Sequence, residues 1–209
     1  MSIAHTEAEK MRLGSIGVGL IGPNAITQMA AALSAICGER LRQEIFGDAG
    51  LARYLAAPPT HMTPEDDVAR LHRAAIGRLG EAQAAEVSRE AGRRTGDYLL
   101  ANRIPPLAQR MLKVTPRPLA ARILAAAIAR HAWTFSGSGE FSYEFSPHLR
   151  LRIAGSPICK GLHTETPACA YFAATFERVF AEMLGPTLSV AEVECEATGA
   201  PACVFEVRW

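Results

Sequence analysis

The chain has 209 residues, of which 49% are hydrophobic and 21% charged, so it can bury a core in one compact domain. Its 22 basic and 21 acidic residues give a formal net charge of +1, which excludes an overall basic field for nucleic acid and a polybasic membrane anchor. Five cysteines are too few, and odd in number, for a disulfide framework, which favours a reducing compartment.

The N-terminal residues 1–15 have the character of a loose polar tail, without the apolar stretch of a signal peptide. The most apolar segment, from Leu119 to Trp133, contains Arg122 and Arg130 and is shorter than the roughly 18 to 20 residues that a membrane-spanning helix needs. We therefore expect a cytoplasmic protein without a transmembrane segment.

The first two-thirds of the chain predict mainly helices. Residues 16–21 are apolar and rich in glycine, which indicates a short strand or a packed turn. A helix is expected from Pro23 to Gly38, and one or two shorter helices over residues 39–57. Thr63 is the expected N-cap of the next helix, because proline follows it at the first helical position and acidic residues fill the first turn.

That helix is expected to end near Gly80, and residues 81–102 form the longest helical stretch. Pro118 opens another helix, to about Trp133. From residue 141 apolar residues alternate with polar ones, as in strands. The elements predicted after that point are two strands, a helix and the two arms of a closing hairpin, over residues 141–145, 149–153, 167–184, 188–196 and 204–209.

Helices first and antiparallel strands later predict an α+β fold, with helices packed on one face of an antiparallel sheet. We expect one domain over residues 16–209, with a helical part to about residue 135 and a sheet part from about residue 136.

Three cysteines and a glutamate in the last fifth of the chain have the spacing of one metal site: Cys169, Glu192, Cys195 and Cys203. Thiolate and carboxylate ligands suit zinc, and four protein ligands make such a site structural. Cys169 is expected in the first helical turn, where the helix dipole lowers the pKa of a thiol. Cys195 and Cys203 are expected to face each other across the hairpin.

Glu192 reaches this site only if its strand bulges, because residues three apart in a regular strand point to opposite faces. Glu194 is the competing carboxylate on geometry alone. The alternative interpretation is that these cysteines are reduced, buried and simply hydrophobic. Cys37 and Cys159 are expected to lie outside the site.

The C-terminal sequence EVECEATGAPACVFEV resembles the signature of the 4-vinyl reductase domain, a small-molecule-binding module that also forms the sensory domain of phenol-responsive bacterial activators. In that family three Cys and one Glu bind a structural zinc, and the resemblance places them at Cys169, Glu192, Cys195 and Cys203. The segments GLIGPNAITQMAAAL, GDYLLANRIP and RHAWTFSGSGEF are similar to bacteriochlorophyll 4-vinyl reductase, the stand-alone member found in photosynthetic bacteria. The resemblance begins near Gly19 and implies a role in bacteriochlorophyll biosynthesis.

The family name implies reduction of a vinyl group, which needs a hydride that side chains cannot supply. Residues 17–22 match GxGxxG, but polar residues precede them, Pro23 follows them and the next segment is predicted helical, so a dinucleotide site is not favoured. The cysteines also lack the close spacing of iron–sulfur ligands.

We therefore expect a tetrapyrrole-binding carrier, or accessory protein, that presents a porphyrin or a magnesium chlorophyllide intermediate to other enzymes of bacteriochlorophyll biosynthesis. A vinyl reductase that uses an external electron donor is the first alternative. A small-molecule sensor or interaction module that works through a partner protein is the second. Related modules commonly pair, so we expect a homodimer, and no nucleic acid partner.

A tetrapyrrole needs an apolar slot with aromatic walls and basic groups at its mouth. The wall candidates, which can equally form the core, are Trp133, Phe135, Phe141, Tyr143 and Phe145. His131 has a helical spacing from Leu124 and Ile128, and is the candidate axial ligand of the tetrapyrrole metal or a satisfied core histidine. The candidates to pair with tetrapyrrole carboxylates, or to be solvated charges, are Arg130, Arg150 and Arg152.

Overall fold

The computed structural model describes residues 19–145 and 147–209 and has an α+β fold, as predicted. The predicted tail, residues 1–15, lies outside the described residues. The helices are α2 (Asn24–Asp48), α3 (Arg53–Ala56), α4 (Glu65–Leu79), α5 (Glu81–Asn102), α6 (Pro106–Val114), α7 (Arg117–Arg130) and α8 (Ala170–Leu184). None of the helices in the described ranges is long and apolar enough to cross a membrane.

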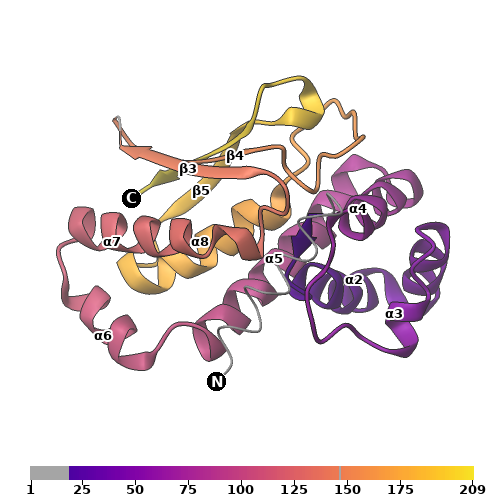
Figure 1. The fold of residues 1–209 in the computed structure, drawn as a ribbon, viewed down its shortest axis with the longest axis horizontal. Helices are drawn as coiled ribbons and strands as arrows, with labels where there is room; N and C mark the ends of the chain where they lie inside the picture. Colours follow the sequence, from indigo (N-terminus) through magenta and orange to yellow (C-terminus); the bar gives the residue numbers. More distant parts are fainter. Residues whose placement is uncertain (1–18, 146) are drawn as a thin grey trace.

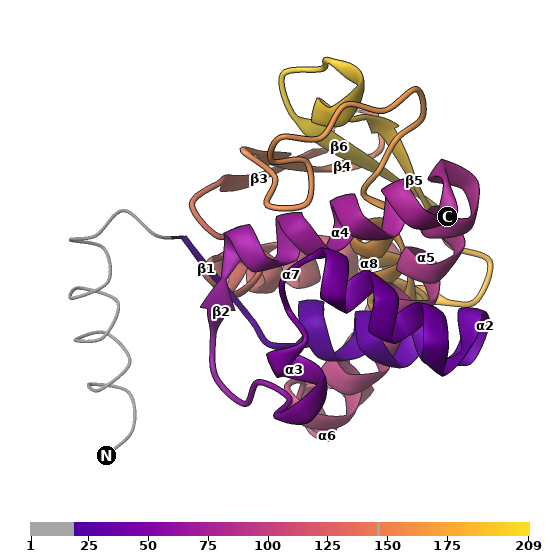
Figure 2. The same cartoon turned by 90° about the vertical axis from the view of Figure 1, so that its right-hand side faces the viewer.

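The main sheet has four antiparallel strands in the order β3-β4-β6-β5. Their bounds, which confirm the predicted strands and closing hairpin, are β3 (Glu140–Phe145), β4 (Leu149–Ala154), β5 (Ser189–Glu194) and β6 (Cys203–Arg208). Figure 1 shows α7 and α8 beneath this sheet, with α2, α3 and α4 gathered at the other end of α5. The view from the side shows the sheet as the outermost layer, with the helices stacked below it (Figure 2).

Helix α2 is interrupted at Gly38, whose φ of 85° and ψ of 166° are not helical. Glycine adopts this conformation without steric cost, so the predicted stop at Gly38 is confirmed as a break in the helix. The chain resumes a helical path to Asp48 and then forms the short α3, which confirms the one or two short helices predicted over residues 39–57.

A two-residue ladder fixes the start of α4. Strand β1 (Leu20–Ile21) pairs antiparallel with β2 (Thr63–Pro64), and the Thr63 hydroxyl donates to the carbonyl oxygen of Ile21 at 3.3 Å. The N-cap position of α4 is Pro64, without a side-chain cap. The predicted N-cap role of Thr63 is therefore wrong, because its hydroxyl bonds to β1 instead.

Glu65, the first residue of α4, ties the helices to the loops near the sheet. Its carboxylate accepts hydrogen bonds from the backbone and hydroxyl of Ser138, both at 2.7 Å, and pairs with Lys160 at 3.1 Å. Burial raises the pKa of Glu65, but the hydrogen bonds from Ser138 and Lys160 outweigh burial and hold this pKa below its usual value. A side chain at Gly19 or Gly137 would overlap the carboxylate, so the expected close packing of the glycine-rich entry is confirmed at Gly19.

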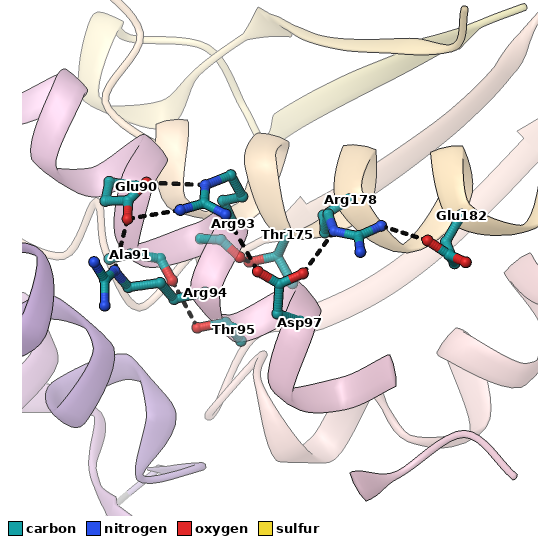
Figure 3. Close-up of polar contacts among 10 residues, drawn as sticks. Glu90, Ala91, Arg93, Arg94, Thr95, Asp97, Thr175, Arg178 and Glu182 are labelled. Atoms are coloured by element: carbon teal, nitrogen blue, oxygen red, sulfur yellow. Dashed lines mark hydrogen bonds and ion pairs between the residues drawn. The ribbon is translucent and has the colours of Figure 1, made fainter. Parts of the chain in front are cut away.

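Helices α5 and α8 pack closely because glycines lie at their contact. A Cβ at Gly92 would overlap the carbonyl oxygen of Tyr171, and a Cβ at Gly96 would lie 2.6 Å from the Cβ of Arg178. Figure 3 shows the polar rim of this contact, in which Asp97 of α5 accepts a 2.6 Å hydrogen bond from Arg178 of α8. The small residues therefore bring the two backbones together, and the ion pair fixes their register.

Helix α6 has no counterpart among the predicted elements. The prolines that suggest a break in the sequence instead delimit this helix: Pro105 is its N-cap and Pro106 its first residue. Helix α7 begins at Arg117, one residue before the predicted start, and a 3-10 turn over Ala132–Thr134 follows it.

Candidate metal centre

Four cysteines from separate segments meet beneath one end of the sheet. Cys159 lies in the turn after β4, Cys169 is the N-cap residue of α8, Cys195 follows β5, and Cys203 begins β6. All four side chains are buried, and none forms a disulfide. Residues up to 44 positions apart in the sequence are thus brought into one cluster.

The spacing of the four sulfur atoms fits a single tetrahedral ion. Cys159 Sγ lies 3.3, 3.6 and 3.5 Å from the Sγ atoms of Cys169, Cys195 and Cys203, and Cys169 and Cys203 are 3.5 Å apart. Cys195 and Cys203 face each other across the hairpin at 4.0 Å, as predicted. A zinc ion with four thiolates at about 2.3 Å has a sulfur–sulfur edge of about 3.8 Å, close to these values. The cluster can therefore hold a thiophilic metal ion.

Hydrogen bonds hold the loops of the cluster in place. The Glu196 carboxylate, at the tip of the hairpin, accepts from the backbone N–H groups of Gly155 and Ser156 at 2.6 and 2.8 Å. The backbone N–H of Ala168 donates to Cys195 Sγ at 3.4 Å, as backbone amides do to a metal-bound thiolate. The loop that carries Cys159 is thus tied to the hairpin that carries Cys195.

Glu192, the predicted fourth ligand, lies beside the cluster. Strand β5 bulges between Glu192 and Glu194, as the sequence requires for Glu192 to turn inward, while Glu194 is exposed. Glu192 Oε2 accepts a 2.8 Å hydrogen bond from the backbone N–H of Cys169, and its buried Oε1 has no hydrogen-bond partner among the described residues. Burial, together with the charge of Cys195, raises the pKa of Glu192 to about 9. A nearby cation would reverse this shift and satisfy the carboxylate.

The expected effect of the helix dipole on Cys169 is wrong for the thiol in its present surroundings. Cys169 lies at the N-cap position, but its side chain is fully buried, and burial raises its pKa well above the usual value. Four clustered thiols cannot all lose their protons without a compensating cation, since like charges would lie within about 4 Å of one another. A divalent metal supplies this compensation.

Cys159 is the residue that the sequence analysis missed. Its neighbours in the sequence give no CxxC pair, and its position depends on the path of the loop between β4 and α8. The one available signal is its place in a tight turn, in which its N–H donates to Ser156 and Gly161 has a φ of 66°. Cys37 lies elsewhere, near Gln83 of α5, as expected.

Two of the predicted wall residues belong to an aromatic cluster between α8 and the sheet. The rings of Phe135 and Phe141 lie 5.4 Å apart, and both pack against Phe176. Phe172 and Phe205 extend the cluster into the core. These rings fill the space between them, so the structure brings Phe135 and Phe141 together as core residues.

The other wall candidates lie at the open edge of the sheet. Tyr143 on the edge strand β3 is 37% exposed and packs edge-on against Phe145, which is also covered by the guanidinium of Arg122 at 5.2 Å. Trp133, in the turn after α7, is 38% exposed. The structure thus leaves aromatic surface accessible where α7 meets β3.

The polar candidates are separated. His131 follows the end of α7 and is exposed, with Nδ1 2.9 Å from the carbonyl oxygen of Ala127, so its predicted place on an apolar helix face is wrong. Arg130 is exposed beside it. Arg150 and Arg152 alternate along β4 with inward-facing leucine and isoleucine residues, and Arg150 pairs with Glu206 at 3.2 Å on the outer face. The sheet therefore separates Arg150 from Tyr143.

Residues 149–209, which contain the whole cysteine cluster, match the 4-vinyl reductase domain. Over 90% of its length the chain is 46% identical to the bacteriochlorophyll synthase 23 kDa chain of Cereibacter sphaeroides, 89% of which is covered. The protein of the same name from Rhodobacter capsulatus is 39% identical over 88% of this chain and 85% of the relative. The chain belongs to the family of the bacteriochlorophyll synthase 23 kDa chain, which confirms the predicted resemblance.

Solved structures share the fold at low sequence identity. An H-NOX protein from S. oneidensis in the Fe(II)NO ligation state has a TM-score of 0.53 at 11% identity, with 90% of this chain and 98% of that chain covered. A structure that probes heme distortion in the H-NOX family also has a TM-score of 0.53, at 13% identity, covering 90% and 95%. The phenol-responsive sensory domain of PoxR with phenol has a TM-score of 0.50 at 15% identity, covering 67% and 71%.

Proposed function

We propose that this protein is an accessory factor of bacteriochlorophyll biosynthesis, which binds a tetrapyrrole intermediate and presents it to the enzymes of that pathway. The observation that carries the proposal is its 46% identity, over 90% of the chain, to a protein named as a chain of bacteriochlorophyll synthase. The shared fold with H-NOX proteins, one of which was studied for its heme distortion, supports a tetrapyrrole as the class of ligand.

We place the ligand at the edge where α7 meets β3. Tyr143, Phe145 and Trp133 present partly exposed aromatic surface there, and a flat apolar pigment stacks on such rings. His131 and Arg130 lie at the end of α7, next to this surface in the chain, where an imidazole and a guanidinium can meet the pigment metal and a carboxylate. Arg150 is not assigned to the pigment, because it faces the other side of the sheet.

The geometry around the glycine-rich segment favours a carrier over a nucleotide-dependent reductase. Leu20–Ile21 pairs antiparallel with Thr63–Pro64, whereas a dinucleotide fingerprint lies between parallel strands of one sheet. Vinyl reduction with electrons from a partner protein is the second candidate, and the resemblance to bacteriochlorophyll 4-vinyl reductase favours it. The pigment test below distinguishes the two.

We further propose that zinc occupies the cysteine cluster as a structural ion, held by Cys159, Cys169, Cys195 and Cys203. Four thiolates complete a tetrahedral shell and leave no position for a substrate. In this arrangement Glu192 stays outside the shell and fixes the Cys169 backbone. The alternative shell, implied by the family resemblance, replaces Cys159 with Glu192.

Metal content distinguishes the two shells. Protein purified without chelator is expected to contain zinc, and Cys159→Ser should lower the zinc content, whereas Glu192→Gln should retain it. Cys37→Ser is the matched control, because Cys37 lies outside the cluster. Full zinc retention in Cys159→Ser together with loss in Glu192→Gln would establish the shell of three cysteines and Glu192 instead.

Pigment binding tests the placement of the ligand. Anaerobic titration with a divinyl magnesium chlorophyllide is expected to shift the pigment absorbance to saturation. Tyr143→Ala should weaken binding about fivefold to tenfold, as the loss of about 1 kcal/mol of stacking implies. His131→Ala should change the band position if the imidazole contacts the metal, with the exposed His148→Ala as its control. Absence of any shift would overturn the proposal.

The proposed partners are the pathway enzymes that receive the pigment, and the proposed compartment is the cytoplasm. A homodimer remains part of the proposal because related modules pair. Sedimentation of the zinc-loaded protein over a range of concentrations tests this state, and a monomer at all concentrations would contradict it.

A further inference from the structure

Helix α6 presents an apolar face to solvent. Leu107, Met111 and Val114 recur at spacings of four and three residues, so they share one side of the helix. They are 69%, 62% and 85% exposed, and α6 has no buried residue. Helix α7 continues the pattern with Leu119 and Ile123, four residues apart and about half exposed. An apolar stripe of this length on two consecutive helices marks an interaction site.

The opposite side of α6 is attached to the rest of the molecule. The side-chain amide of Gln109 donates to the carbonyl oxygens of Leu100 and Ile104 at 2.6 and 2.8 Å. Lys113 pairs with Glu182 of α8 at 2.5 Å. These contacts hold α6 with its apolar stripe outward, so the exposure follows from how the helix is anchored.

The same segment is strongly basic. Residues 98–139 contain no Asp or Glu, but contain six basic residues, Arg103, Arg110, Lys113, Arg117, Arg122 and Arg130. Among the described residues, Arg110, Arg117 and Arg130 make no ion pair, whereas Arg178 of the neighbouring α8 is paired twice. The near-neutral charge of the whole chain therefore conceals a positive segment, and the expectation of no polybasic anchor does not hold locally.

We propose that the exposed stripe of α6 and the start of α7 docks on an anionic lipid surface. A helix with an apolar face and flanking arginines lies in the interface of a bilayer, with its apolar side chains in the acyl boundary and its charges at the headgroups. The proposal does not depend on the pigment or on the metal.

Charge decides between a lipid surface and a second copy of this chain. A twofold interface would place the same patch on both subunits, so unpaired arginines would meet unpaired arginines. An anionic bilayer instead supplies the negative charge that residues 98–139 lack. The surface is therefore assigned to lipid.

Vesicle flotation tests the assignment. The full-length protein should float with vesicles of phosphatidylcholine and phosphatidylglycerol, and much less with phosphatidylcholine alone, and added salt should weaken the binding. Arg110→Gln with Arg117→Gln should reduce the partition constant about 30-fold, since each basic residue near the surface contributes about fivefold. Met111→Ser with Val114→Ser should reduce it as well.

Matched controls carry the same changes elsewhere. Arg89→Gln with Arg152→Gln removes two charges outside the segment, and Ile36→Ser removes an exposed apolar residue of α2. These variants should bind like the unsubstituted protein. Equal binding to neutral and anionic vesicles, or equal losses in the controls, would overturn the proposal. So would absence of vesicle binding combined with self-association that Met111→Ser with Val114→Ser abolishes, which would assign the stripe to a second copy.

Discussion

Replacing Gly92 with alanine tests whether the contact of α5 with α8 supports the metal centre. The added methyl group would overlap the carbonyl oxygen of Tyr171 and lie 3.0 Å from the Cβ of Ala174. Both obstacles are parts of the α8 backbone or its first side-chain atoms, so neither can move aside without moving the helix. Tyr171 lies two residues after Cys169, and a displaced first turn of α8 therefore shifts one of the four sulfur atoms.

The magnitude follows from two opposing effects. Forcing a methyl group into a packed contact costs about 1–3 kcal/mol, while replacing glycine by alanine inside a helix returns about 0.5–1 kcal/mol. A net loss of about 1–2 kcal/mol corresponds to a fall in Tm of about 2–8 °C for a chain of this size.

Thermal unfolding of Gly92→Ala and Gly77→Ala, with the zinc content of each, provides the assay. Gly77 lies in α4, and a Cβ there meets nothing within 4 Å, so Gly77→Ala should raise the Tm slightly. Gly92→Ala should lower both the Tm and the retained zinc. A Gly92→Ala protein as stable as Gly77→Ala would refute the reasoning about this contact.

Three further changes have defined outcomes. Burial lowers the pKa of His72 to about 4, so the unfolded chain takes up a proton that the folded protein refuses as pH falls from about 6.5 to about 4. Chemical denaturation should show a stability about 2 kcal/mol lower at pH about 5 than at pH about 7 from this group, and His72→Leu should lack that difference. The pKa of Glu65 is lowered, so its carboxylate contributes stability above about pH 4.3 that is lost in acid, and Glu65→Gln should flatten this acid limb; an unchanged acid limb would exclude the role of the Ser138 and Lys160 contacts. Cys203→Ser should lower the Tm broadly and release zinc, whereas a normal Tm with lost pigment binding would indicate a functional thiol.

Local signals in the sequence predict most of the elements. The bounds of α5 match the predicted residues 81–102, because Gly80 stops the preceding helix and the prolines after Arg103 end this one. The alternation of apolar residues predicts β3 and β4 for the same reason: a strand buried on one face needs a period of two. The bulge at Glu192 also follows from spacing alone.

The features that depend on distant contacts do not follow from local patterns. Thr63 has the sequence of a helix cap, but pairing with Ile21, 42 residues earlier, determines its hydrogen bond. Cys159 joins the cluster only because Glu196 and Lys160 fix the path of its loop. The basic apolar stripe of α6 depends on which side of the helix Gln109 and Lys113 anchor.

The metal centre and the proposed pigment site occupy different parts of the sheet. The cysteine cluster joins the loop after β4, the start of α8 and the closing hairpin, whereas the exposed aromatic residues lie on the edge strand β3. Helix α8 connects them, since Cys169 caps it and Phe176 packs on Phe141. Zinc removal should therefore lower stability first and pigment affinity only as a consequence.

The central claim, that the chain carries a tetrapyrrole without changing it, is tested most directly by product analysis. Zinc-loaded protein is incubated anaerobically with a divinyl magnesium chlorophyllide, with and without NADPH or reduced ferredoxin, and the pigment is then extracted and identified. A saturable absorbance shift with the divinyl pigment recovered intact under both conditions is the predicted result. Appearance of the ethyl product only when the electron donor is present would contradict the carrier and establish a vinyl reductase.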